Sequence, residues 1–443
     1  MDDLVRGDPA DYDPRLFMFL PSDMGGNKIR YKNSKLSAKK LSSWSRRLLS
    51  FYSFNETSYK ELGNKMNLNR NLPSLGGVAE LQSDPKVAFI FLYDKETLVP
   101  EDELILHQLV QPIMDLNRNA YIYKSSDTEK FLRLIEQRET ELTNKYLNEY
   151  VEEGEEKLQF DKGLFDAKTL STFPMMLCIK ENTLLSPVYQ SFSSRDMRDI
   201  GKIINFIKTN ADPTYEELNL YSKKQVFPTK FDSNIHDYTE KVVVAILDDN
   251  DYTDMFKKSY YLTFINQSLN YVKEVFQYKN LLAKRKLKYE EVERVGPRRA
   301  LKALKKKIDN VFKTPEYRVS TVYMTRTTLL FSQKWWPYID VSKYNVGDAF
   351  IVSRFENQYW DNHGKPFKLD EPKLIIDTIN EANFNGLKGM KMNNSLEIFS
   401  TLKTLSIFGV LVFVALKLVK RYKRSNRVSL LPVHHNRLPF KKS

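Results

Sequence analysis

The sequence predicts an α/β protein built from tandem units, with one membrane-spanning helix near its C-terminus. Residues 87–93 and 240–247 are continuous apolar runs rich in β-branched and aromatic side chains, which is typical of buried strands. Each run is followed by a segment with helical features, and this alternation of strands and helices indicates the α/β class. Residues 398–419 form another apolar stretch, and a membrane span needs about 20 such residues.

The composition fits packed domains and excludes several functional classes. The chain has 443 residues with 27 Phe and 25 Tyr, which is enough for more than one core. The net charge of +13 is local: residues 417–443 hold nine Lys or Arg and no acidic residue, and residues 284–307 hold eleven against three Glu. A single cysteine, Cys178, cannot form an intramolecular disulfide or a Cys-x-x-Cys pair. We predict no metal site, no cofactor and no catalytic residue.

Residues 86–210 carry the clearest domain pattern. The predicted elements are strand 87–93, helix 104–116, strand 120–123, helix 128–152, strands 175–180 and 187–190, and helix 194–208. This order, βαβ-α-ββ-α with a proline opening the last hairpin, is that of the thioredoxin fold, in which this proline is in the cis form. We therefore predict a cis peptide bond between Phe173 and Pro174.

Two further units are predicted on either side of this one. Residues 1–80 are expected to form a degenerate thioredoxin-like unit. Residues 211–238 are predicted to be a linker. Residues 240–385 are predicted to form a third, divergent thioredoxin-like domain with a long basic helical insertion at 252–312, broken at Gly296 where a proline follows.

The apolar stretch that begins at Ile398 and ends at Val419 is predicted to be a transmembrane helix. It is followed at once by basic residues that a protein core could not bury: Lys420, Arg421, Lys423 and Arg424. Positive flanks stay in the cytosol, so the tail 420–443 is predicted to be cytosolic and the bulk of the chain luminal. The glycosylation sequons at Asn55 and Asn266 are compatible with that side.

The N-terminal sequence conflicts with this topology, because it lacks the apolar core of a signal peptide. Two interpretations remain open. Either the chain is the C-terminal part of a longer protein, or it is a tail-anchored protein that faces the cytosol. We favour the first, because the second would place the basic tail in the lumen against the charge rule.

Three stretches of sequence carry a resemblance to a known family, together with the C-terminal span and its basic tail. They read FLYDKETLVPEDELILHQLVQPIMDL (91–116), FPMMLCIKENTLLSPVYQSFSSRDMRDIGKIINFIKTNADP (173–213) and YNVGDAFIVSRFENQYWDN (344–362). They resemble the membrane-anchored protein disulfide isomerases of the yeast endoplasmic reticulum (ER). Such proteins begin with a signal peptide and a catalytic Cys-x-x-Cys domain, and this sequence contains neither.

The resemblance also implies roles for individual residues. Some members carry a second Cys-x-x-Cys, and the matching stretch YKNSKLSAKKLSSW (31–44) has Ser34 and Ser37 in its place. A serine cannot supply a thiolate or close a disulfide, so this unit is expected to have lost redox function. An unrelated helix cap is the alternative. Phe173 and Pro174 match the loop that catalytic relatives place beside substrate, although a purely structural role is equally open.

We therefore expect a type I ER-membrane protein that binds unfolded or misfolded clients, membrane proteins included, in folding and quality control. The lipid bilayer is the second expected partner. Nucleic acid is not expected, because leucines between the charges of 284–307 indicate an amphipathic helix with a solvated basic face. Two alternatives remain: a truncated copy of an active thiol-disulfide oxidoreductase, and a tail-anchored cytosolic scaffold.

Overall fold

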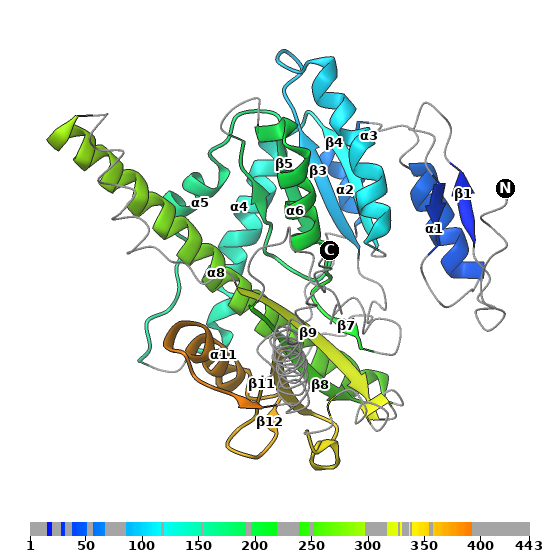
Figure 1. The fold of residues 1–443 in the computed structure, drawn as a ribbon, viewed down its shortest axis with the longest axis vertical. Coiled ribbons are helices and arrows are strands. Elements are labelled where there is room, and N and C mark those ends of the chain that lie inside the picture. Colours follow the sequence, from blue (N-terminus) through cyan, green and yellow to red (C-terminus); the bar gives the residue numbers. More distant parts are fainter. Residues whose placement is uncertain are drawn as a thin grey trace, which may run out of the picture.

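A computed structural model shows two sheet-centred units and a small N-terminal module (Figure 1). We call them the N-terminal module (residues 16–50), the central unit (56–213) and the C-terminal unit (214–391). Within these, the structure describes residues 16–19, 28–31, 38–50, 56–66, 86–116, 119–151, 154–191, 196–218, 239–248, 251–296, 317–326, 328–329, 336, 339–353 and 358–391.

The central unit is a four-stranded sheet with helices on both faces. Its main elements are β3 (Val87–Leu92), α3 (Pro100–Asp115), β4 (Ala120–Ser125), α4 (Thr128–Asn144), α5 (Lys162–Thr169), β5 (Met175–Lys180), β6 (Val188–Tyr189) and α6 (Ile200–Asn210). The strand order is β4-β3-β5-β6. β3 is parallel to β4 and antiparallel to β5, and β5 is antiparallel to β6. These directions and this element order are those of the thioredoxin fold.

Strand β3 is buried along its whole length because helices cover both faces of the sheet. Phe89 packs in one cluster with Leu109 of α3 and Ile203 of α6. Its neighbour Ile90 points to the opposite face and packs in a second cluster with Phe131 of α4. Burial on both faces explains why the sequence of this strand is a continuous apolar run instead of an alternating one.

The central unit begins earlier than the sequence predicts. The short helix α2 (Tyr59–Lys65) contributes Leu62 to the same core cluster as α4 and β5. Glu56 forms a parallel bridge with Lys124, which extends the sheet beyond β4. The predicted boundary after residue 80 is therefore wrong, because a one-residue bridge and a two-turn helix leave too little periodicity to be recognised.

The N-terminal module is a hairpin followed by a helix. β1 (Phe17–Phe19) pairs antiparallel with β2 (Lys28–Arg30), and α1 (Ala38–Ser50) follows. Ile29 and Leu48 pack in the cluster that covers α3 of the central unit. The same sequence of hairpin and helix closes the central unit, where it is formed by β5, β6 and α6.

The C-terminal unit repeats the topology of the central one. Its elements are β7 (Glu216–Glu217), β8 (Thr239–Leu247), α8 (Tyr252–Val295), β9 (Tyr317–Thr325), β10 (Asp348–Ser353), β11 (Gln358–Trp360), β12 (Phe367–Lys368), α11 (Pro372–Asn380) and β13 (Met390–Lys391). The sheet order is β13-β11-β10-β8-β9-β7, with β8 parallel to β9 and antiparallel to β10. The segment predicted as a linker therefore supplies the edge strand β7 near its start.

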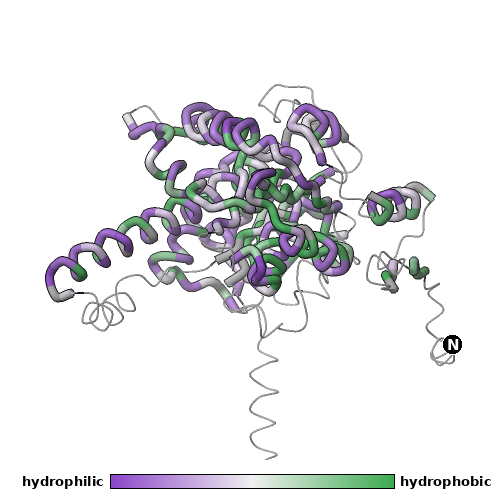
Figure 2. The backbone as a smooth tube through the Cα atoms, turned by 90° about the horizontal axis from the view of Figure 1, so that it is seen from above, coloured by the Kyte–Doolittle hydropathy of each residue, from purple (hydrophilic) through white to green (hydrophobic). Residues whose placement is uncertain are grey.

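Helix α8 is the crossover between β8 and β9, not an insertion into the domain. Leu262, Ile265 and Leu269 in its first half pack on the sheet. Its second half projects away from both units (Figure 1), and polar residues interspersed with apolar ones line this arm (Figure 2). The helix ends at Val295, before Gly296 with a φ of +77°, in agreement with the predicted break.

Several predictions concern residues outside the described part of the chain. They are Ser34, Ser37 and Asn55, the span from Ile398 to Val419, and the basic flank Lys420, Arg421, Lys423 and Arg424. Within the described ranges, no helix has the length and apolarity that crossing a bilayer requires.

Aromatic side chains fill the interface between the central and C-terminal units. Tyr146, from the 3-10 helix Tyr146–Tyr150 that follows α4, packs edge-on against Tyr260 of α8, with ring centroids 5.9 Å apart. The rings of Tyr150 and Phe264 are 4.6 Å apart. Across the same boundary, the backbone N–H of Leu184 donates a 2.7 Å hydrogen bond to the side-chain oxygen of the fully buried Gln267. The two units thus share a hydrophobic cluster of their own at the boundary.

A buried group of three charges also links the two units. Nζ of Lys168 on α5 lies 3.0 Å from Oε2 of Glu139 on α4 and 2.7 Å from Oε2 of Glu274 on α8. Burial raises the pKa of Glu139, against the opposing effect of Lys168. Burial alone would lower the pKa of Lys168, but the carboxylates of Glu274 and Glu139 outweigh it and raise that pKa. The negative charges of Glu139 and Glu274 are thus balanced by one ammonium group, that of Lys168.

The substitution Lys168→Ala should lower the free energy of unfolding by about 3 kcal/mol, because it leaves the buried carboxylate of Glu139 without a counter-charge and removes the ion pair with the partly exposed Glu274. Lys162→Ala, on the same helix, is the matched control: its ion pairs with Glu136 and Asp166 are exposed, so stability should change little. Urea unfolding at pH 7, followed by tryptophan fluorescence, measures both. Equal losses in the two variants would contradict a structural role for the buried group.

Candidate functional site

The loops that follow β3 and β4 meet the loop that precedes β5 at one edge of the central sheet. β3 and β4 are parallel and both end there, and Leu92 at the end of β3 is paired with Met175 at the start of β5. In open α/β sheets, ligands bind outside the carboxyl ends of the strands. We call the segments 93–99, 126–127 and 170–174 the carboxyl edge.

The loop before β5 is held in a fixed conformation at this edge. The peptide bond between Phe173 and Pro174 is cis, and Pro174 is buried. The backbone N–H of Thr172 donates to the carbonyl of Ser191 at 2.6 Å, and the N–H of Ser191 donates to Oγ of Ser171 at 2.7 Å. Among the described residues, nothing takes up the backbone N–H or C=O of Phe173. The backbone N–H and C=O of Phe173, the residue before the cis-proline, are therefore left for an external hydrogen-bond partner.

Exposed apolar side chains occur in the same segments of the carboxyl edge. Leu170, just before the loop, is 57% exposed, and the phenyl ring of Phe173 is half-buried. Val99, which precedes the first residue of α3, is also exposed and gives that helix no side-chain cap. The edge thus combines hydrogen-bonding backbone with a small apolar surface.

The carboxyl edge contains no thiol. The residues between β3 and α3, where thioredoxin-like enzymes carry their cysteines, read DKETLV at 94–99. Cys178 lies instead in the middle of β5, fully buried, with Sγ 3.7 Å from the carbonyl oxygen of Asn210. Burial raises the pKa of its thiol to about 12, so it stays protonated at neutral pH and cannot act as a nucleophile.

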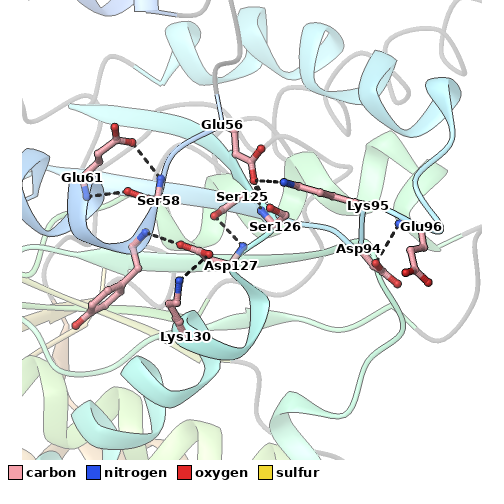
Figure 3. A network of polar contacts seen from close by, with 11 residues as sticks. Glu56, Ser58, Glu61, Asp94, Lys95, Glu96, Ser125, Ser126, Asp127 and Lys130 are labelled. Carbon is pink, nitrogen blue, oxygen red and sulfur yellow. Dashed lines mark hydrogen bonds and ion pairs between the residues drawn. The ribbon is translucent and has the colours of Figure 1, made fainter.

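A network of polar contacts fastens α2 to this edge (Figure 3). Oε1 of Glu56 accepts a hydrogen bond from the hydroxyl of Ser126 and one of 3.3 Å from its backbone N–H. The ammonium group of Lys95 lies 3.6 Å from the same carboxylate oxygen. The hydrogen bond from the Ser126 side chain is the main reason that the pKa of Glu56 lies below its ordinary value, with smaller contributions from the Ser126 backbone and Lys95.

Asp127 holds the start of α2 in the same way. Its Oδ2 accepts a 3.2 Å hydrogen bond from the backbone N–H of Tyr59, and its Oδ1 lies 3.1 Å from Nζ of Lys130. The hydrogen bond from Lys130 lowers the pKa of Asp127. Ser58 and Glu61 add a capping box, a sequence signal that could have revealed this helix. Sequence reasoning missed Glu56, Ser126 and Asp127 as a group because Glu56 lies far along the chain from the neighbouring pair Ser126 and Asp127.

The sequon at Asn266 lies between the two units and not on an open loop. Asn266 lines a polar cleft of about 220 Å³, and its side-chain oxygen accepts a 3.0 Å hydrogen bond from Asn270. The middle residue of the sequon, Gln267, is fully buried and holds the interface. A glycan on Nδ2 of Asn266 would have to occupy this cleft, because Asn266 is one of its lining residues. The structure therefore argues against the use of this sequon.

No protein-family model matches the sequence. The chain is 22% identical over 414 residues to the ER-retained PMA1-suppressing protein 1 of Saccharomyces cerevisiae, a match that covers 87% of this chain and 55% of the relative. The chain thus spans about half the length of the curated relative it matches. Similar solved structures include the bb fragment of ERp72 (TM-score 0.31, 9% identity, 68% of this chain and 90% of that one) and human ERp44 (0.29, 8%, 86% and 72%). The chain is a distant homologue of the yeast protein.

Glu56→Gln should lower the free energy of unfolding at pH 7 by about 0.5–1 kcal/mol, because its exposed hydrogen bonds are charge-assisted but screened by solvent. The folded-state pKa of Glu56 is lowered, so its stabilisation is present above the unfolded-state value and is lost as pH falls through the folded-state value. The difference between variant and wild type should therefore shrink as the pH is lowered from 7 to 3. Denaturant unfolding at both pH values tests this, with the exposed Glu129→Gln as control.

Proposed function

We propose that this chain is a redox-inactive, protein-disulfide-isomerase-like protein of the ER membrane that binds non-native client chains. The name of its yeast homologue links that protein to retention in the ER. The thioredoxin-like order of the central sheet supports the isomerase-like part, and the absence of any Cys-x-x-Cys in the sequence supports the redox-inactive part.

The backbone N–H and C=O of Phe173 carry the client-binding part of the proposal, because neither has a hydrogen-bond partner among the described residues. An extended chain can hydrogen-bond to the N–H and C=O of Phe173 while its apolar side chains contact Leu170 and Val99. Such contacts recognise the backbone and the apolar side chains of a client and do not depend on a particular client sequence. Non-native chains expose both, so this edge suits clients that share no motif.

Because the carboxyl edge has no cysteine, we expect it to bind clients without catalysing thiol-disulfide exchange. Catalytic relatives attack a client disulfide with a thiolate and release it after exchange. Here the corresponding turn carries Asp94, Lys95 and Glu96, and the buried thiol of Cys178 cannot reach a client. Clients would therefore leave this edge by dissociation alone.

Leu170→Asp should weaken binding of an unfolded client about tenfold, because it places a charge where an apolar side chain would be buried. Leu158→Asp is the matched control, since Leu158 is 42% exposed but lies outside the carboxyl edge. Fluorescence anisotropy of a labelled, reduced and unfolded client measures the affinity, and urea unfolding of each variant confirms that it folds.

Equal loss of affinity in both leucine variants would count against binding at the carboxyl edge. Turnover above background in an insulin-reduction assay with the wild-type chain would refute the redox-inactive part alone.

Membrane anchoring by residues 398–419 predicts that alkaline carbonate leaves the protein in the microsomal pellet, and that deletion of those residues releases it. Protease added to sealed microsomes should remove only the basic tail, because the bulk of the chain is proposed to be luminal. Release of the intact protein by carbonate would overturn the membrane proposal and leave the client-binding one standing.

A further inference from the structure

The C-terminal unit exposes four apolar side chains close to the last described residue. Phe276, Phe384, Leu387 and Met390 are each between 38% and 41% exposed, and we call them the apolar patch. The rings of Phe276 on α8 and Phe384 on the π-helix Glu381–Asn385 have centroids 5.4 Å apart. Leu387 and Met390 follow Phe384 closely in the sequence, and Met390 is the first residue of β13. Clustered exposed apolar groups of this kind mark an interaction site.

The patch belongs to the folded unit and is not part of a loose tail. The carbonyl of Leu387 accepts a 3.3 Å hydrogen bond from the indole N–H of Trp360. Gly389 lies flat on the same indole, so closely that a Cβ there would be 2.6 Å from Cε2. Met390 is in register with Tyr359 in the pairing of β13 and β11. These contacts fix the backbone that presents the apolar side chains.

The position of the patch along the chain indicates what covers it. The last described residue is Lys391, and the predicted membrane span starts at Ile398. Seven extended residues reach at most about 25 Å, so a chain anchored at Ile398 holds Lys391, next to Met390 of the patch, within that distance of the anchor. Lys388 and Lys391 are exposed among the apolar residues, and lysine can place its ammonium group at lipid phosphates while its stem lies on apolar surface.

We infer that the apolar patch docks on the lipid surface beside the membrane span. The four apolar side chains enter the boundary between headgroups and acyl chains, and the two lysines contact the phosphates, as in interfacial protein segments. This inference rests on the proposed membrane anchoring and goes beyond it: the C-terminal unit lies against the bilayer in one orientation instead of swinging on a tether.

Fluorescence of the full-length protein in phosphatidylcholine–phosphatidylserine vesicles tests the docking. An environment-sensitive thiol-reactive fluorophore is attached to Leu387→Cys, or to Leu158→Cys as a control of equal exposure in the central unit. Cys178 is fully buried, so the labelled wild type gives the background. Lipids with a quencher near the headgroup should reduce the signal at position 387 at least twofold and leave position 158 unchanged. Met390→Cys provides a second probe of the patch.

The outcomes separate the inference from the proposal beneath it. Protein that floats with the vesicles but is quenched equally at positions 387 and 158 overturns the docking and leaves the anchoring intact. Protein that does not float overturns both. Disulfide-linked dimers through Leu387→Cys, without quenching, would assign the patch to a second copy of the chain and also overturn the inference.

Discussion

The contact between α8 and the helices α4 and α5 is the constraint on which the arrangement of the two sheets depends. Aromatic side chains provide the buried apolar surface at this contact. The ion pairs of Lys168 with Glu139 and Glu274 favour the relative position in which all three charges meet. A docking that separated Glu274 from Lys168 would remove one of the two carboxylates that pair with this buried ammonium group. The interface therefore favours the observed placement of the central and C-terminal units.

The carboxyl edge shows how a thioredoxin-like unit can keep a binding surface without its chemistry. The cis-proline loop is held by hydrogen bonds to Ser191, and the N–H and C=O of Phe173 have no partner among the described residues. The turn that would carry cysteines holds charged residues instead, and Lys95 contributes to the contacts around Glu56. This edge therefore has polar contacts that hold α2 in place and no reactive group. Such contacts keep the surface rigid, which favours binding.

The sequence reveals the parts of this fold that have a strong periodic signal. The continuous apolar runs of β3 and β8, the order of elements around Pro174 and the break at Gly296 were all readable, since each depends on local patterns. Contacts between residues far apart in the chain could not be predicted from the sequence. Nothing in the sequence near Glu56 indicates that it meets Ser126, and nothing in the sequon at Asn266 indicates that Gln267 is buried against another unit. The role of α8 as a crossover was hidden by its length.

Helix α8 has a mechanical consequence. At 1.5 Å per residue its 44 residues form a rod about 66 Å long, rooted in one sheet and clamped midway by its neighbours. Because an uninterrupted helix resists bending, a force on its tip acts as torque on the clamp. A binding partner at that end would therefore exert torque on the interface between the two units without contacting either sheet.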